Sequence, residues 1–359
     1  MRVLVLHPGP DFSVHDVFTG WMEALRDLLG PGNVAPFNMN DRLVAFSNAL
    51  RDTHQYDETG HPIVTNMFSE EGVFYAAMEG LSHAMLTFWP DIVLCVSGFF
   101  LNAGTMQLMR MRRFKVVMLC TESPYQDSEQ MDRAQLSDLV LLNDPTNLDM
   151  FRGVTRAEYM PHAYRPVLHR PRTGPPDANL ACDLAFIGTA FKSRIEFFEQ
   201  MDLDGLDVLI AGGDWGNVPQ DSPVAKFVAT GPTGPGGPDC VDNTQAVQVY
   251  QNAKCGINFY RREARPEENW DGAGWAMGPR EIEMAATGLW FTRDPRPEGD
   301  QVLPMLPTFT SPEEASEQIR WALRNNTLRQ VAAARARAAI ADRTFENNAK
   351  RFLALAEKL

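Results

Sequence analysis

The sequence predicts an α/β protein with two Rossmann-like parallel-sheet domains that face a cleft. First, short and almost wholly apolar runs alternate with amphipathic segments, a pattern typical of parallel strands covered by helices on both faces. Second, this alternation occurs twice, on either side of a stretch at 157–180 that contains five prolines. Third, the chain has 359 residues, whereas a single hydrophobic core stops growing near about 250–300 residues. Two domains are therefore expected.

The first half opens with a strand and a helix. The apolar run 2–7 meets Pro-Gly-Pro, which marks a buried strand. Helical spacing of apolar residues over 17–30 predicts a helix that Ser13 or Asp16 caps and Gly30 ends. The polar segment that follows is expected to hold a weak strand and an insertion. This segment spans 31–70, after which strands are expected at 92–100, 115–120 and 138–143 and helices at 71–88, 103–113 and 145–153.

The second half repeats the pattern after a linker at 166–180. Ser311 and Glu314 match a capping box at the start of one of its last helices. The domains are therefore expected at 1–165 and 181–340, with a C-terminal helix at 341–359 that packs back on the first domain. Strands are expected at 183–188, 206–213, 255–261 and 289–294, helices at 189–201, 246–254, 278–288, 311–325 and over roughly the last 35 residues, and a long loop at 214–243.

The composition is that of a folded protein rather than a disordered one. Hydrophobic residues make up 44% of the chain and charged residues 22%. The net charge of −13 argues against a bulk nucleic-acid coat or an anionic membrane surface as the main partner, although a local basic groove stays open. Five cysteines without C-x-x-C spacing favour buried thiols in a reducing compartment over a catalytic thiol or a zinc site.

Targeting and membrane segments are not expected. The amino-terminal apolar run is too short for a signal peptide, and no stretch approaches the about 18 apolar residues of a membrane span. These observations predict a cytoplasmic protein.

In open parallel sheets, ligands bind outside the carboxyl ends of the strands, so the loops that follow the strands are the candidate binding segments. A helix that begins after such a loop directs its free N–H groups and its positive dipole end toward an anion. The candidate loops comprise residues 7–16, 99–104, 121–127, 188–189 and 261–279.

The stretch 278–288 carries the most specific pattern. Pro279 suits the first turn of a helix, and Arg280 and Glu283 are three positions apart and therefore share a face. A glutamate near a helix start that faces a cleft can accept both hydroxyls of a ribose, and an arginine beside it can pair with a diphosphate. An ordinary surface ion pair is the alternative.

This stretch resembles the carboxy-terminal signature of the CgeB-like (spore maturation protein B) glycosyltransferases, which belong to the GT-B group of nucleotide-sugar transferases. The resemblance rests on the pattern R-x-x-E-x-A-A-x-G from Arg280 to Gly288, followed by an apolar strand and Asp294. It covers most of 135–355 and is weak over 30–90. Three further segments are similar to the family in order and spacing, namely 158–171, 182–194 and 255–262.

The resemblance implies a GT-B fold in which the second domain binds the nucleotide sugar and the first domain binds the acceptor. At the matching positions, Glu283 holds the donor ribose and Arg280 faces the phosphates. The loop of Gly188 and Thr189 also approaches the diphosphate.

The leaving diphosphate is expected to be stabilised without a metal ion, because the chain has no convincing Asp-x-Asp motif. Arg261, Arg262 and Arg280 are the candidate cations, and Tyr260 is a candidate for stacking on the base or the sugar. Many retaining GT-B enzymes carry a second glutamate where this chain has Trp275, so the stereochemical outcome stays open.

His15 follows the first strand and precedes a helix, a position that resembles that of the general base in several inverting GT-B enzymes. The ordinary histidine pKa of about 6.5 suits removal of a proton from a hydroxyl group. Asp16 or Glu122 is expected to orient it, and Glu122 is also a candidate for acceptor binding. A helix-capping or solvent-exposed histidine is the alternative.

The sequence therefore predicts a glycosyltransferase that moves a sugar from a nucleoside-diphosphate sugar, with a UDP-sugar favoured, to a hydroxyl acceptor without a further cofactor. The acceptor stays open between a glycan, a protein, a small molecule and modified DNA. The alternatives are a phage-type DNA glycosyltransferase acting on hydroxymethylated bases, a nucleotide-sugar epimerase and a non-catalytic nucleotide-sugar binder.

Overall fold

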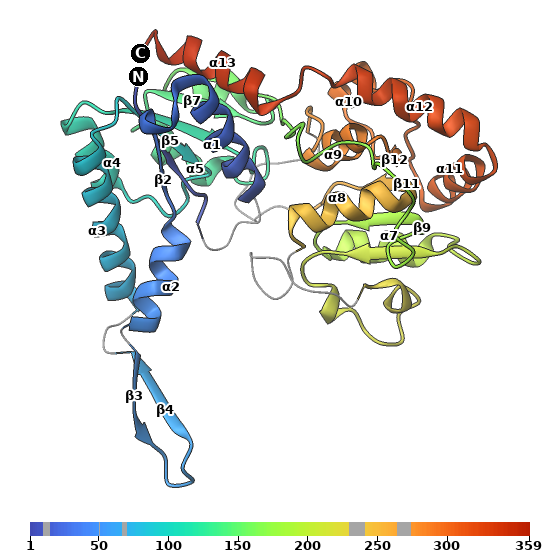
Figure 1. The fold of residues 1–359 in the computed structure, drawn as a ribbon, viewed down its shortest axis with the longest axis horizontal. Coiled ribbons are helices and arrows are strands. Elements are labelled where there is room, and N and C mark those ends of the chain that lie inside the picture. The colour runs from blue at the N-terminus through green and yellow to red at the C-terminus, as the bar shows by residue number, and fades with distance from the viewer. Residues whose placement is uncertain (10–14, 50, 67–69, 230–240, 264–273) are drawn as a thin grey trace.

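The computed structural model describes residues 1–9, 15–49, 51–66, 70–229, 241–263 and 274–359. It contains one parallel sheet in each half of the chain, and the two lie side by side with helices on their faces (Figure 1). The predicted fold class of two parallel-sheet α/β domains is confirmed.

The first sheet has six parallel strands in the order β2-β1-β5-β6-β7-β8. The order of the strands reverses at β1, because β2 lies on one side of it and β5 on the other. Val3 and Val5 are buried on one face of the sheet, and Leu4 and Leu6 on the other. The strands are β1 (Val3–Leu6), β2 (Val34–Phe37), β5 (Ile92–Val96), β6 (Lys115–Cys120), β7 (Leu139–Leu142) and β8 (Ala157–Tyr159).

Helices cover both faces of this sheet, which explains why its strands are almost wholly apolar. One face packs against α1 (His15–Leu29) and α13 (Phe345–Ala356), the last helix of the chain. The other packs against α3 (Glu70–Phe88) and α4 (Ala103–Met111), with shorter contributions from α5 (Asp127–Ala134) and α6 (Leu148–Arg152).

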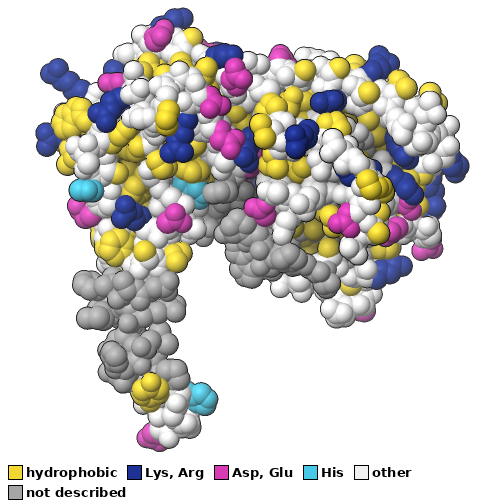
Figure 2. Space-filling model, viewed as in Figure 1, with side chains coloured by type: hydrophobic (Ala, Val, Ile, Leu, Met, Phe, Trp, Pro, Cys, Tyr) yellow, Lys and Arg dark blue, Asp and Glu magenta, His cyan; other side chains and the backbone are white. Residues whose placement is uncertain are grey.

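The segment 31–70 is more regular than the sequence indicated. It holds β2, the helix α2 (Met39–Ala49) and an antiparallel hairpin of β3 (Arg51–Tyr56) and β4 (Pro62–Asn66). Pro36 obscured β2 in the sequence, because a sheet tolerates proline mainly in an edge strand such as this one. The hairpin extends away from both sheets in Figure 1, and the turn at 57–61 between its strands lies far from the rest of the described surface in Figure 2.

The second sheet has four parallel strands in the order β10-β9-β11-β12, with a reversal between β9 and β11. Its helices form a single apolar core with the strands. The strands are β9 (Cys182–Ile187), β10 (Val208–Ala211), β11 (Ala253–Asn258) and β12 (Trp290–Arg293), and the helices are α7 (Lys192–Gln200), α8 (Asn243–Asn252), α9 (Pro279–Thr287), α10 (Pro297–Val302), α11 (Pro312–Arg324) and α12 (Asn326–Ala339).

Three elements differ from the expectation. No strand was predicted in the proline-rich stretch, but it begins with β8, a strand of only three residues at the far edge of the first sheet. The short helix α10 was not predicted, since it offers fewer than two turns of periodicity. The C-terminal helical region is two helices, α12 and α13, because the chain turns at 340–344 to return to the first sheet.

The C-terminal helix packs on α1. The indole of Trp21 makes edge-to-face contacts with Phe352 and Phe345, with ring centroids 5.6 and 6.4 Å apart. The two connections between the halves run beside each other here, because the amide of Tyr164 donates to the carbonyl of Arg343 at 2.9 Å. The chain therefore crosses between the two sheets twice.

Four cysteines lie in the described residues, namely Cys95, Cys120, Cys182 and Cys255, and all are buried free thiols. Cys240 lies outside the described residues. No helix in this part of the chain is long and apolar enough to cross a membrane.

Gly20 tests the packing of α13. A Cβ at Gly20 would overlap the ring of Phe345, so Gly20→Ala must push α13 away from α1. Overpacking costs typically about 1–3 kcal/mol, which exceeds the gain of up to about 1 kcal/mol from placing alanine in a helix. We expect urea denaturation to give a lower free energy of unfolding. Gly80→Ala in α3 is the matched control, because its Cβ meets only ordinary contacts and should stabilise the fold; equal stabilisation by both variants would contradict the packing argument.

Candidate active site

A cleft opens between the two sheets, where the carboxyl ends of their strands face each other. It encloses a cavity of about 780 Å³, within the range of ligand sites. The loops that line it include those after β6, β9 and β11, and the start of α9. Because β9 and β11 flank the reversal of strand order in the second sheet, their loops lie where ligands of such sheets bind.

Gly188 and Thr189 line the cleft directly after β9. The main chain is close-packed here, since the indole nitrogen of Trp215 donates to the carbonyl of Gly188 at 2.7 Å. Gly212 has a φ of +139°, and a Cβ there would overlap the main chain of Gly188. A glycine is therefore required at 212 to hold the loop of Gly188 in place.

Arg194, in the first turn of α7, points into the same part of the cleft. Its Nε donates to the carbonyl of Phe259 at 3.0 Å, and another guanidinium nitrogen donates to the carbonyl of Thr189 at 3.0 Å. Burial lowers the pKa of Arg194 to about 10. Within the described residues, no carboxylate forms an ion pair with it. A partly buried positive charge held by two carbonyls and no acid is suited to receive an anion.

The first turn of α9 brings Arg280 and Glu283 together. A guanidinium nitrogen of Arg280 lies 2.7 Å from Oε2 of Glu283, whose side chain is 9% exposed. The same nitrogen donates to Oδ1 of Asn243 at 3.1 Å. Burial acts to lower the pKa of Arg280, but Glu283, Tyr250 and Asp16 together raise that pKa above its ordinary value. The pair lines the cleft and is not an ordinary surface ion pair.

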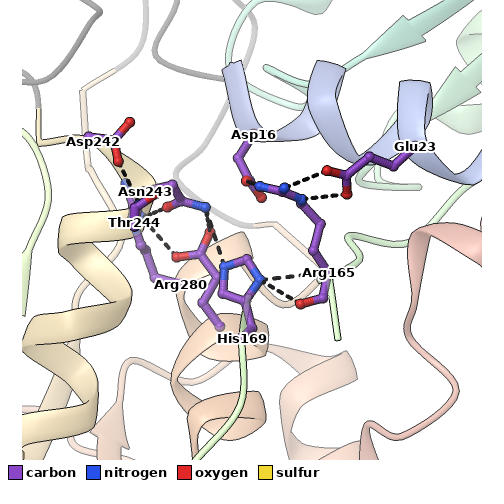
Figure 3. A network of polar contacts seen from close by, with 9 residues as sticks. Asp16, Glu23, Arg165, His169, Asp242, Asn243, Thr244 and Arg280 are labelled. Atoms are coloured by element: carbon purple, nitrogen blue, oxygen red, sulfur yellow. Dashed lines mark hydrogen bonds and ion pairs between the residues drawn. The ribbon is translucent and has the colours of Figure 1, made fainter. Parts of the chain in front are cut away.

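A polar network joins Arg280 and Glu283 to the segment that leads from the first half of the chain to the second, called the crossover below, which contains Arg165 and His169 (Figure 3). Nδ2 of Asn243 lies 3.3 Å from Nε2 of His169 and 3.5 Å from Oε1 of Glu283. Nδ1 of His169 lies 3.1 Å from the amide nitrogen of Arg165. The guanidinium of Arg165 in turn binds Asp16 of α1 at 2.7 Å. Helix α9 of the second half and helix α1 of the first half are thus linked through the crossover.

One ion pair bridges the cleft. Glu122, after β6, accepts from Arg261, after β11, at 2.9 Å. The guanidinium of Arg261 also lies over the ring of Tyr125, 4.0 Å from its centroid. Both side chains are about one-fifth exposed. Opposite walls of the cleft are therefore joined by a charge pair that solvent and ligands can reach.

Tyr260 is held by its hydroxyl group. The hydroxyl donates to the carboxylate of Glu281 and accepts from the amide of Gly278 at 2.8 Å. The guanidinium of Arg296 covers the ring at 4.2 Å from the centroid. The side chain lines the cleft but is only 8% exposed, so its main contacts are with the start of α9.

The predicted catalytic residues lie on the other wall. His15 begins α1, and its side chain lies outside the described residues. Asp16 does not cap α1 but lies in its first turn, lines the cleft and pairs with Arg165. Glu122 also lines the cleft, but its described ion pair is with Arg261.

Arg262 and Trp275 take other positions. Arg262 is 45% exposed and pairs with Asp294 at 2.7 Å. The indole of Trp275 packs edge-to-face against Tyr159 of the first sheet, and its amide donates to Asp144 at 2.9 Å. Trp275 therefore fixes the approach of the chain to α9.

Sequence reasoning missed Arg194, Asn243 and His169. Arg194 ends the segment 182–194 and stands in the first turn of the helix after the Gly188 loop, which was a usable signal. Asn243 was assigned to a loop, and His169 to the linker, where neither has a recognisable spacing. In the described part of the chain, no three His, Cys, Asp or Glu side chains are grouped to hold a metal ion.

Comparison with known proteins gives the class. Residues 194–354 match the family model described as glycosyl transferase-like. The comparison with curated protein sequences found no match.

Solved structures share the whole fold. A sucrose-phosphate synthase from Thermosynechococcus elongatus aligns over 100% of this chain and 98% of its own, with 12% identity and a TM-score of 0.64. A glycosyltransferase from Rickettsia africae aligns over 99% and 98%, with 12% identity and a TM-score of 0.59. An E. coli structure described as trehalose-6-phosphate bound with UDP-2-fluoro glucose aligns over 100% and 99%, with 11% identity and a TM-score of 0.58.

The fold is therefore that of the GT-B glycosyltransferases, and the family match agrees with it over most of the second half. Together they show that the chain is similar to the GT-B glycosyltransferases, in fold over its whole length and in sequence over 194–354.

The carboxyl group of Glu281 makes the stability of the protein depend on pH. The side chain is fully buried, and burial raises its pKa to about 7, against the opposing hydrogen bond from Tyr260. Because the folded state holds its proton up to about pH 7 and the unfolded state only to pH 4.5, ionisation removes stability as the pH rises through this window. The loss is on the order of 3 kcal/mol.

Glu281→Gln should remove this loss. We expect the unfolding free energy of the variant, relative to the wild type, to rise between pH 5 and pH 8 in urea denaturation. Glu317→Gln, at an exposed position, is the control and should keep the wild-type dependence. A Glu281→Gln variant whose stability follows the wild type across this range would refute the assignment.

Proposed function

We propose that the chain transfers a sugar from a nucleoside-diphosphate sugar to a hydroxyl acceptor in the cleft. The observation that carries the proposal is Arg194, a partly buried guanidinium with two carbonyl partners and no ion-paired acid among the described residues. It lies beside the Gly188 loop at the reversal of the second sheet, where a diphosphate would meet the start of α7. We further propose that the chain belongs to the CgeB-like branch, on the pattern that begins at Arg280.

The donor ribose is assigned to Glu283. Each oxygen of its carboxylate has lone pairs beyond those facing Arg280 and Asn243, so it can accept from both ribose hydroxyls. UDP is the favoured nucleotide, which the UDP-2-fluoro glucose named with the E. coli neighbour supports.

The diphosphate is assigned to Arg194, Arg261 and Arg280. The loop of Gly188 and Thr189 and the side chain of Tyr260 complete the proposed donor site. Three guanidinium groups can offset the charge that grows on the leaving phosphate, so the proposed reaction needs no metal ion. Arg261 serves this role only if it leaves Glu122, because the two form an ion pair in the structure.

The proposed reaction is a displacement at the anomeric carbon. The bond from this carbon to the phosphate oxygen breaks, and the acceptor oxygen forms the new bond. The hydroxyl proton passes to a base on the wall of the first sheet, where His15 begins α1 and where Asp16 and Glu122 line the cleft. Release of Glu122 from Arg261 by the donor would free its carboxylate for the acceptor.

Arg194→Gln should weaken UDP binding. Loss of a charge-assisted contact to phosphate costs about 1.5–3 kcal/mol, which corresponds to about 10- to 100-fold in dissociation constant. Isothermal titration and the thermal shift with UDP measure it. Lys192→Gln is the control on the same helix, because Lys192 is 83% exposed and pairs with Glu196. Equal UDP affinity in wild type and Arg194→Gln would contradict the donor site.

Glu122→Gln separates catalysis from donor binding. We expect turnover to fall by about 10²- to 10⁴-fold, as for loss of an acid–base group, while UDP binds at least as tightly as to the wild type. The second part follows because Arg261 loses its competing carboxylate. Steady-state turnover and UDP titration on the same preparation test both parts. Weaker UDP binding with unchanged turnover would show that Glu122 belongs to the donor side.

A further inference from the structure

The two walls of the cleft differ in charge. The wall from the second half carries Arg194, Arg261, Arg280 and Arg296. The wall from the first half carries carboxylates instead, among them those of Asp16, Glu122, Glu129 and Asp144. Among the lining residues that the structure describes, no lysine or arginine comes from the first half. Residues 10–14 contain no lysine or arginine either.

Two cations of the first half, Arg133 and Arg165, already have partners, and the guanidinium of Arg133 lies 5.8 Å from the ring centroid of Phe99. Arg133 is outside the cleft lining and donates to three carbonyls, those of Phe99, Leu101 and Glu129. Arg165 pairs with Asp16 and with a second carboxylate of α1. His162 lines the cleft, but burial lowers its pKa to about 4, so it is uncharged at neutral pH.

The end of this wall away from the second sheet is apolar. Leu43 of α2, Phe74 of α3 and Phe99 and Phe100 after β5 line the cleft. Leu43, Phe74 and Phe100 are partly exposed and rest on the core of the first sheet. The helices α2 and α3 bracket the projecting hairpin, so the inserted segment supplies part of the wall. An apolar surface open to a cleft is suited to a ring or another apolar group.

We propose that the acceptor is a hydroxyl compound that carries an apolar ring and no negative charge. The ring lies against Phe74 and Phe99, and its hydroxyl reaches Glu122 at the centre of the cleft. A phosphorylated acceptor would have to place its charge among carboxylates with no cation of that wall to offset them. The inference rests on the proposed donor site, and it separates this chain from the neighbours that are named for sugar phosphates.

The test compares two probes on the full chain saturated with UDP. The neutral aryl sugar 4-nitrophenyl β-glucoside presents a ring and hydroxyls, whereas glucose 6-phosphate presents hydroxyls and a dianion. Isothermal titration should show the aryl glucoside binding at least about 10-fold more tightly than glucose 6-phosphate. Tighter binding of glucose 6-phosphate, or no binding of the aryl glucoside, would overturn the inference.

Variants locate the site. Phe74→Ala and Phe99→Ala should each weaken the aryl glucoside about 10-fold and leave UDP affinity unchanged, which also shows that the variants fold. Tyr75→Ala is the matched control, because Tyr75 neighbours Phe74, is 55% exposed and does not line the cleft. Equal effects of Tyr75→Ala and Phe74→Ala would contradict the placement.

The donor and acceptor questions stay separable. Failure of the wild type to bind UDP counts against the proposed function, and the two probes are then compared without UDP. UDP binding that depends on Arg194, combined with preference for glucose 6-phosphate, leaves the proposed function standing and removes the acceptor inference.

Discussion

Two buried carboxylates fix the position of the two halves of the molecule relative to each other, and the geometry of the candidate site depends on them. Glu298, 2% exposed, accepts from the hydroxyl of Tyr159 at 2.7 Å, from the amide of Met277 at 2.8 Å and from Arg343 at 2.7 Å. Asp144 of the first half accepts from the amides of Trp275 and Ala276, each at 2.9 Å. Since residues 275–277 lead into α9, its first turn, and with it Glu283, is positioned by groups from both sheets. A buried carboxylate is tolerated only with such partners, which makes the arrangement specific.

The opposite charges of the two walls follow from what each is proposed to bind. A diphosphate brings negative charge to the second half, so arginines there gain partners on binding. In the structure, Arg261 forms an ion pair with Glu122 across the cleft, while Arg194 donates hydrogen bonds to carbonyl groups. The side chains of Arg261 and Glu122 are about one-fifth exposed, so a diphosphate can reach the guanidinium of Arg261. The two walls are thus joined by an ion pair that the proposed donor would exchange for its own phosphates.

The strands and the start of α9 could be predicted because their signals are local. Buried parallel strands read as apolar runs, and Arg280 and Glu283 share a helix face by spacing alone. The edge strands β2 and β8 were harder, since Pro36 interrupts one and the other has three residues. Asn243 and His169 meet Glu283 only through the fold, from a helix start and from the crossover. Tertiary contacts of this kind produce no periodic pattern in the sequence.

The division between predictable and unpredictable parts has a physical basis in the ligands. The donor side must meet a diphosphate and a ribose, whose geometry is fixed, so its residues recur with set spacing, and the family match covers 194–354. The acceptor wall is built partly by α2 and α3 around an insertion, in the region where the resemblance is weak. An apolar wall needs only volume and exposed rings, which many sequences supply. Under the proposed function, acceptor choice would therefore depend on Phe74, Phe99 and their neighbours, where no motif would indicate it.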